Sequence, residues 1–88
     1  MRFTVIWRPS ATNELADIWV KATDRRQITE TTFAIDQELS VDPESKGEQF
    51  DEHRRILIDL PLAVMFTVSE QDRMVAVLQV RLIEKRQQ

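Results

Sequence analysis

The sequence predicts an α+β fold: an N-terminal strand, a two-helix hairpin, and then a three-stranded antiparallel meander, with the helices packed on one face of the sheet. Two observations predict it. Apolar residues recur at helical spacing between residues 9 and 41, and three short apolar runs separated by turn residues occupy residues 54–82. A chain of 88 residues is expected to form a single domain, 1–88, of which residues 83–88 are expected to be a flexible tail.

The first predicted element is a strand over residues 2–8, where apolar and other residues alternate. Pro9 ends it, because proline offers no N–H to a sheet and suits the first turn of a helix. Phe3, Val5 and Trp7 share one face of this strand, and Thr4 and Ile6 share the other.

The first helix follows from Pro9. Its apolar stripe at i, i+4, i+7, i+8 and i+11 consists of Ala11, Leu15, Ile18, Trp19 and Ala22. Because both tryptophans of the chain, Trp7 and Trp19, lie on apolar stripes, we interpret them as core residues.

A second helix is predicted to run to about Val41. Asp24 and Gln27 have the spacing of an N-terminal capping box, and Asp42-Pro43 ends the helix because the residue before proline disfavours helical geometry. Its stripe is Ile28, Thr32, Ile35 and Leu39, and Phe33 falls off it. Residues 43–53 show no evident structure and are expected to form a loop that Phe50 holds against the helices or the sheet edge.

The meander has turns at residues 59–61 and 69–73. Strict alternation predicts one apolar face under the helices, with Ile56, Ile58 and Leu60, then Leu62, Val64, Phe66 and Val68, then Met74, Ala76, Leu78, Val80 and Leu82. The opposite face is then Arg55, Leu57 and Asp59, then Ala63, Met65 and Thr67, then Val75, Val77, Gln79 and Arg81. Exposed together, Leu57, Met65, Val75 and Val77 would favour a protein partner.

Composition excludes several classes of function. The net charge is −3, and the acidic residues concentrate in residues 23–53. Because proteins that bind DNA directly usually carry an excess of positive charge, no direct DNA binding is expected. There is no cysteine, which fits a cytoplasmic protein. No apolar run has the length of a signal peptide or a membrane span, so no membrane association is expected.

The usual catalytic signatures are missing from the sequence. There is no cysteine nucleophile, the single glycine excludes a glycine-rich phosphate loop, and the only histidine, His53, lies between charged residues and is read as a solvated side chain. The carboxylates of residues 36–52 do not have calcium-loop spacing. No metal and no cofactor is therefore expected.

The basic residues near the end of the chain are the remaining candidates for chemistry. Arg55 and Arg81 are expected on the exposed sheet face, and Lys85 and Arg86 follow on the tail. Such arginines could bind phosphates or carboxylates, or only keep an open sheet face soluble.

The element order and several segments resemble the RelE/ParE toxin superfamily over roughly residues 3–82. The segments that carry the resemblance are Trp7–Ala11, Ile18-Trp19, Arg55–Leu57, Val64–Val68, Asp72-Arg73 and Val75–Arg81. The resemblance implies the toxin half of a toxin–antitoxin module of the plasmid-stabilisation type, held inactive by an antitoxin that wraps it. It also implies one of two targets: RelE-like members cleave messenger RNA on the ribosome, and ParE-like members poison DNA gyrase.

The residues favour the ParE-like branch. RelE-like members are similar to one another in using basic residues on the sheet face with a tyrosine or histidine near the C-terminus. This chain has no tyrosine, its histidine precedes the meander, and Ala63 stands where an arginine is expected. Arg55, Arg81 and Lys85 remain the only candidate catalytic residues, and the chain is more simply interpreted as a non-enzyme.

The sequence therefore predicts a ParE-like toxin that binds an antitoxin and acts by protein contact on DNA gyrase. Two alternatives stay open: a RelE-like ribosome-dependent endoribonuclease, and a non-toxic member that retains only antitoxin binding. The residues expected to bind a partner are Arg55, Leu57, Met65, Val75, Val77, Arg81 and Arg86.

Overall fold

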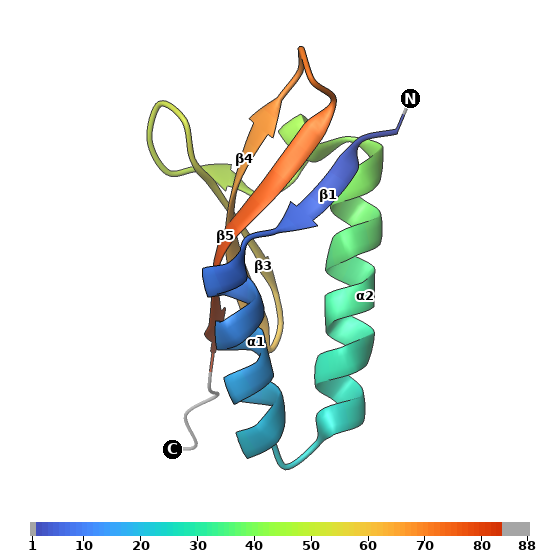
Figure 1. Cartoon of the computed structure of the whole chain (residues 1–88), viewed down its shortest axis with the longest axis vertical. Helices are drawn as coiled ribbons and strands as arrows, with labels where there is room; N and C mark the ends of the chain where they lie inside the picture. Colours follow the sequence, from blue (N-terminus) through green and yellow to red (C-terminus); the bar gives the residue numbers. More distant parts are fainter. Residues whose placement is uncertain (1, 84–88) are drawn as a thin grey trace.

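The computed structural model describes residues 2–83 and has two layers, a mixed sheet with two helices on one of its faces (Figure 1). The chain begins with β1 (Thr4–Trp7), α1 (Pro9–Lys21) and α2 (Arg25–Val41). A 3-10 turn, η1 (Pro43–Ser45), leads to β2 (Glu48–Gln49), β3 (Arg55–Asp59), β4 (Leu62–Ser69) and β5 (Met74–Leu82). The predicted fold class and element order are confirmed.

The sheet has five strands in the order β1-β5-β4-β3-β2. β3, β4 and β5 form the predicted antiparallel meander, and β1 joins it parallel to β5 after the chain crosses over through both helices. The fifth strand was not predicted: β2 is two residues long and pairs with β3 inside the segment that we expected to be a plain loop.

The core lies between the sheet and the helices. Ala11 of α1 and Ile28, Ile35 and Leu39 of α2 are buried, as their spacing predicts. The sheet contributes Leu57, Leu62, Val64, Phe66, Val75, Val77 and Val80. These positions decide which side of the sheet is left open.

All of β3 and the part of β5 before residue 78 have the opposite facing from that predicted, and the cause differs between them. In β5 a bulge separates the pairs Phe66↔Val77 and Met65↔Gln79, so Leu78 has no partner and the alternation changes phase. Val75 and Val77 therefore point to the core before the bulge and Val80 after it.

β3 is reversed for a different reason. Three apolar residues in a row, from Ile56 to Ile58, suit either face, and register decides between them. Leu57 lies opposite the buried Val64, so Leu57 points to the core and its two neighbours point away.

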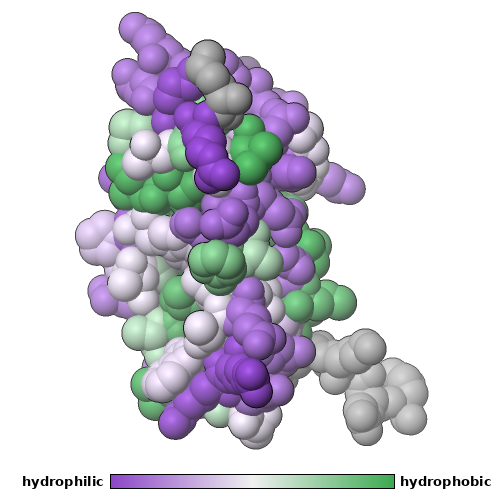
Figure 2. Space-filling view, turned by 90° about the vertical axis from the view of Figure 1, so that its right-hand side faces the viewer, coloured by the Kyte–Doolittle hydropathy of each residue, from purple (hydrophilic) through white to green (hydrophobic). Residues whose placement is uncertain are grey.

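None of the helices in residues 2–83 combines the length and the apolar character that crossing a membrane would need. Seen from the α2 side, apolar side chains form separate patches among hydrophilic ones (Figure 2).

Candidate functional site

The sheet surface that the helices leave uncovered is the first candidate site. We call it the open face, and its residues are Ile6, Ile56, Ile58, Ala63, Met65, Thr67, Ala76, Gln79 and Arg81. Ile6 and Ile58 are exposed, and Met65 is partly exposed. The surface is mostly apolar, which suits contact with a protein better than contact with a polyanion.

Arg81 is the arginine that the strand pairing places on the open face, opposite Ala63. Its guanidinium does not point freely into solvent, because Nη1 donates to Glu14 Oε2 of α1 at 2.8 Å. The other oxygen of Glu14 accepts the backbone N–H of Val80 at 2.8 Å. Chiefly through that N–H, and also through Arg81, the pKa of Glu14 is held below its usual value.

Arg55 is not on the open face, contrary to the prediction. It lies opposite Phe66 and two residues before Leu57, so alternation directs it to the helix side. There it donates to the carbonyl oxygens of Lys46 at 3.1 Å and Gly47 at 3.2 Å. Arg55 and Arg81 therefore lie on opposite faces of the sheet and cannot act together on one phosphate.

The loop that precedes β3 is organised by Asp51. Its carboxylate accepts the backbone N–H groups of His53 and Arg54 and pairs with the Arg54 side chain, Oδ2 to Nη2, at 2.6 Å. These bonds, the Arg54 side chain first, lower the pKa of Asp51 to about 2. Arg54 in turn lies over the exposed Phe50 ring, 5.1 Å from its centre. His53 is exposed, as predicted.

The predicted partner-binding residues divide into four groups. Met65 and Arg81 lie on the open face, and Arg55 lies on the helix side of the sheet. Leu57, Val75 and Val77 are buried under the helices, so their expected exposure was wrong. Arg86 lies outside the described residues, as do the catalytic candidate Lys85 and all of the expected tail except Ile83. Among residues 2–83, no cluster of three or more His, Asp or Glu side chains could hold a metal ion.

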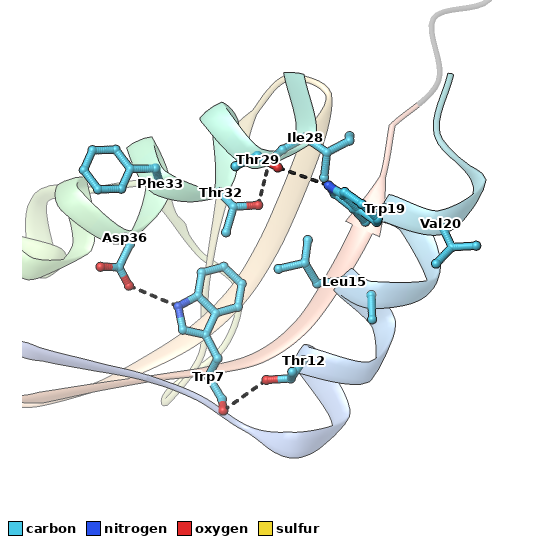
Figure 3. Close-up of a pocket in the computed structure, with 11 residues that line it drawn as sticks. Trp7, Thr12, Leu15, Trp19, Val20, Ile28, Thr29, Thr32, Phe33 and Asp36 are labelled. Atoms are coloured by element: carbon cyan, nitrogen blue, oxygen red, sulfur yellow. Dashed lines mark hydrogen bonds between the residues drawn. The ribbon is translucent and has the colours of Figure 1, made fainter. Parts of the chain in front are cut away.

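A second candidate site is an apolar groove of about 590 Å³ along the helical hairpin (Figure 3). Its floor includes Trp7, Leu15 and Ile28, while Val20 of α1 and Phe33 of α2 line it as exposed residues. Val20 is 59% exposed and Phe33 65%, and because both line the same groove they form part of one apolar surface.

The indole N–H groups and the Thr32 hydroxyl in the groove already have partners within the chain. The Trp7 indole N–H donates to Asp36 Oδ1 and the Trp19 indole N–H donates to Thr29 Oγ1, each at 3.1 Å (Figure 3). Thr32 Oγ1 donates to the Ile28 carbonyl at 2.7 Å. An apolar occupant would therefore break none of these hydrogen bonds.

The groove was not predicted, because Trp19 was assigned to the core. Trp19 is 41% exposed, since it lies in the last turn of α1, and the guanidinium of Arg25 covers its ring 4.8 Å from the centre. One signal in the sequence does indicate the groove: Phe33 stands off the buried stripe of its helix. An aromatic residue there indicates a second apolar surface.

Comparison with known proteins gives structural matches only. No family model matches the chain, and no curated protein matches it. The RelBE2 toxin–antitoxin complex of Mycobacterium tuberculosis contains a chain that is 14% identical, with a TM-score of 0.78 over 93% of this chain and 92% of that one.

Two further structures agree with this match. A chain of the chromosomal ParDE system of Pseudomonas aeruginosa is 16% identical, with a TM-score of 0.64 over 93% of this chain and 97% of that one. The isolated Escherichia coli RelE toxin is 17% identical, with a TM-score of 0.58 over 96% of this chain and 87% of that one. The chain therefore has the fold found in RelE and ParE toxin–antitoxin proteins, and the predicted resemblance is confirmed for the fold.

Proposed function

We propose that this chain is the toxin component of a toxin–antitoxin pair, of the ParE-like kind, neutralised by a cognate antitoxin and acting by protein contact with DNA gyrase as its target. One observation carries the choice of branch. The open face presents isoleucine and methionine side chains, and the two arginines that reach it are both paired, Arg81 with Glu14 and Arg54, which contacts Met65, with Asp51.

Electrostatics supports the proposal. Cleaving RNA requires free cationic groups around the scissile phosphate and groups that move protons. Within residues 2–83, Arg55 is bound to backbone carbonyls on the other side of the sheet and Arg54 is paired with Asp51. With a net charge of −3, the chain would also approach a ribosomal RNA surface against repulsion.

The test is a pair of assays with the purified chain. We expect it to inhibit gyrase supercoiling, and we expect translated messenger RNA to stay intact after induction in cells. Ile58→Asp should abolish gyrase inhibition, because Ile58 lies on the open face, while Val41→Asp, at similar exposure on α2, should not. Fragmented messages with unaffected gyrase would overturn the proposal.

That outcome would favour the second candidate, a RelE-like ribosome-dependent endoribonuclease that uses Arg55, Arg81 and Lys85. Primer extension on translated messages, with the double variant Arg55→Ala and Arg81→Ala as control, decides it. Growth that continues after induction, with tight binding of the antitoxin, would instead identify an inert interaction module.

A further inference from the structure

β3 is an edge strand over part of its length. β2 pairs with it only at Arg55 and Ile56, and among residues 2–83 no other strand lies on that side of β3. At its far end, the chain turns at Leu60 and Pro61 into β4. A stretch of three residues, 57–59, therefore has one uncovered side.

The backbone groups of Ile58 point to this uncovered side. The Arg54 carbonyl accepts the Phe50 N–H at 2.8 Å across the same edge. Because the backbone groups of a strand alternate between its two neighbours, those of Ile56 and Ile58 point the same way as those of Arg54. Ile56 lies opposite Glu48 of β2, whereas Ile58 lies beyond the end of β2. The N–H and carbonyl of Ile58 can therefore pair with a further strand.

The side chains around this edge are apolar. Ile58 is 59% exposed and Leu60 60%, and Phe50 is exposed beside them. A hollow of about 510 Å³ lies along the edge, lined by residues 47–50 and 56–58. Exposed apolar side chains next to unpaired backbone groups favour association with another strand.

A second copy of the same stretch fits this edge in one register. An extended arm of another protein would run into β2 after three residues, whereas the stretch of a second copy ends where its own chain turns towards β4. Antiparallel pairing centred on Ile58 places Ile58 opposite Ile58 of the second copy, and Leu57 opposite its Asp59. Pairing centred on Asp59 would instead place two carboxylates opposite each other, which is unfavourable.

We infer that two copies of this chain associate through β3, with a two-fold axis at Ile58 that joins their two sheets into one. Each Ile58 N–H donates to the Ile58 carbonyl of the other copy, because residues opposite each other in this kind of pair exchange both hydrogen bonds. The two isoleucine side chains contact each other, and Leu60 of each copy lies beside the hollow of the other. So small a contact gives a weak, reversible dimer.

The first test uses the fact that a residue on a two-fold axis meets its own copy. Ile58→Lys and Ile58→Glu should each weaken dimerisation by about tenfold or more, because like charges then face each other. An equimolar mixture of the two variants should form dimers that contain one of each. Val41→Lys and Val41→Glu, at 54% exposure on α2, are the controls and should dimerise like the unmodified chain.

Sedimentation equilibrium from micromolar to millimolar concentration measures the association, and circular dichroism checks that all four variants are folded. A chain that stays monomeric at millimolar concentration would overturn the inference. So would a dimer that Ile58→Lys and Ile58→Glu each retain, or a mixture of these variants that stays monomeric.

Amide hydrogen exchange provides the second test, because it locates the contact. The Ile58 N–H should exchange at least about tenfold more slowly at the concentration at which the dimer forms than in dilute solution. The N–H groups of Leu57 and Asp59, which point to β4, should change much less and serve as internal references. A dimer in which the exchange of the Ile58 N–H is unchanged would also overturn the inference.

This inference goes beyond the proposed function and does not rest on it. Because the axis is perpendicular to the sheet, the two open faces lie on the same side of the joined sheet and form one larger surface. If the chain inhibits gyrase but stays monomeric, the dimer fails and the proposed function stands. If the chain dimerises as described but neither inhibits gyrase nor arrests growth, the toxin proposal fails and the dimer stands.

Discussion

At the scale of single residues, Gly47 is required by the backbone in two ways. Its φ is 66°, and a Cβ at this position would collide with the carbonyl oxygen of Ile56 on β3. We expect Gly47→Ala to lower the free energy of unfolding by about 2 kcal/mol, because both the left-handed conformation and the close approach must relax. Urea denaturation measures this, and Glu48→Ala at the neighbouring position in β2 serves as control. Equal stability of the two variants would contradict the account.

Glu38 is a residue at which pH should matter. Burial on α2, and then hydrogen bonding to Asp59, raise its pKa above the ordinary value of 4.5. A raised carboxyl pKa means that the folded state gains stability when Glu38 is protonated and loses it as pH rises through the folded-state pKa.

We therefore expect Glu38→Gln to raise the thermal midpoint at neutral pH by a few degrees, because the amide carries no charge and can still donate to Asp59. Below pH 4.5 the difference should disappear, since the native glutamic acid is then neutral as well. Melting curves from pH 3.5 to 7.5 check this, with the exposed Glu48→Gln as a matched control. If the thermal midpoint of Glu38→Gln stayed above that of the unmodified chain below pH 4.5, this mechanism would be excluded.

At the scale of elements, α2 depends on its N-terminal cap. Asp24 Oδ1 accepts the Gln27 backbone N–H at 3.1 Å, the bond predicted from their spacing. Asp24→Ala should cost about 1 kcal/mol, whereas Asp24→Asn, which can still accept that bond, should cost much less. The two are compared by urea unfolding. Similar losses would show that the charge of Asp24, and not its hydrogen bond, supports the helix.

The helices could be predicted from the sequence in detail except for the facing of Trp19, and the sheet only in outline. A helix repeats its buried positions over several turns, so the stripe from Ile28 to Leu39 indicates one face. In β5 the facing depends on a single unpaired residue, Leu78, whose effect comes from pairing with β4. In β3 every central residue is apolar, so the pattern itself contains no information about the face.

The same limit applies to the candidate site. Arg81 and Met65 were predicted on the open face and lie there, because β4 alternates regularly and β5 changes phase before Arg81. Leu57, Val75 and Val77 were predicted beside them and are buried. The partner of Arg81 could not be predicted, since Glu14 reaches it from another element 67 residues away in sequence.

At the scale of the whole molecule, two apolar surfaces lie on different layers, the open face on the sheet and the groove on the helices. Because they share no residue, we expect their functions to be separable. Ile58→Asp should abolish gyrase inhibition, whereas Val20→Asp, at the same exposure but in the groove, should leave gyrase inhibition unchanged. Parallel gyrase supercoiling assays on the two variants check this. Loss of gyrase inhibition in both variants would contradict it.

The point at which β5 stops pairing with β1 affects whether copies of the protein aggregate. β1 covers β5 only up to Val77. Beyond it, side chains take the place of a neighbouring strand: Ser10 Oγ donates to the Leu78 carbonyl at 3.1 Å and Glu14 accepts the Val80 N–H. An uncovered edge of this kind is a template for fibril growth, and these two side chains block it. Removing both, as Ser10→Ala with Glu14→Ala, should make the protein form thioflavin-binding aggregates, while Asn13→Ala with Asp17→Ala on the same helix should bind no more thioflavin than the unmodified chain.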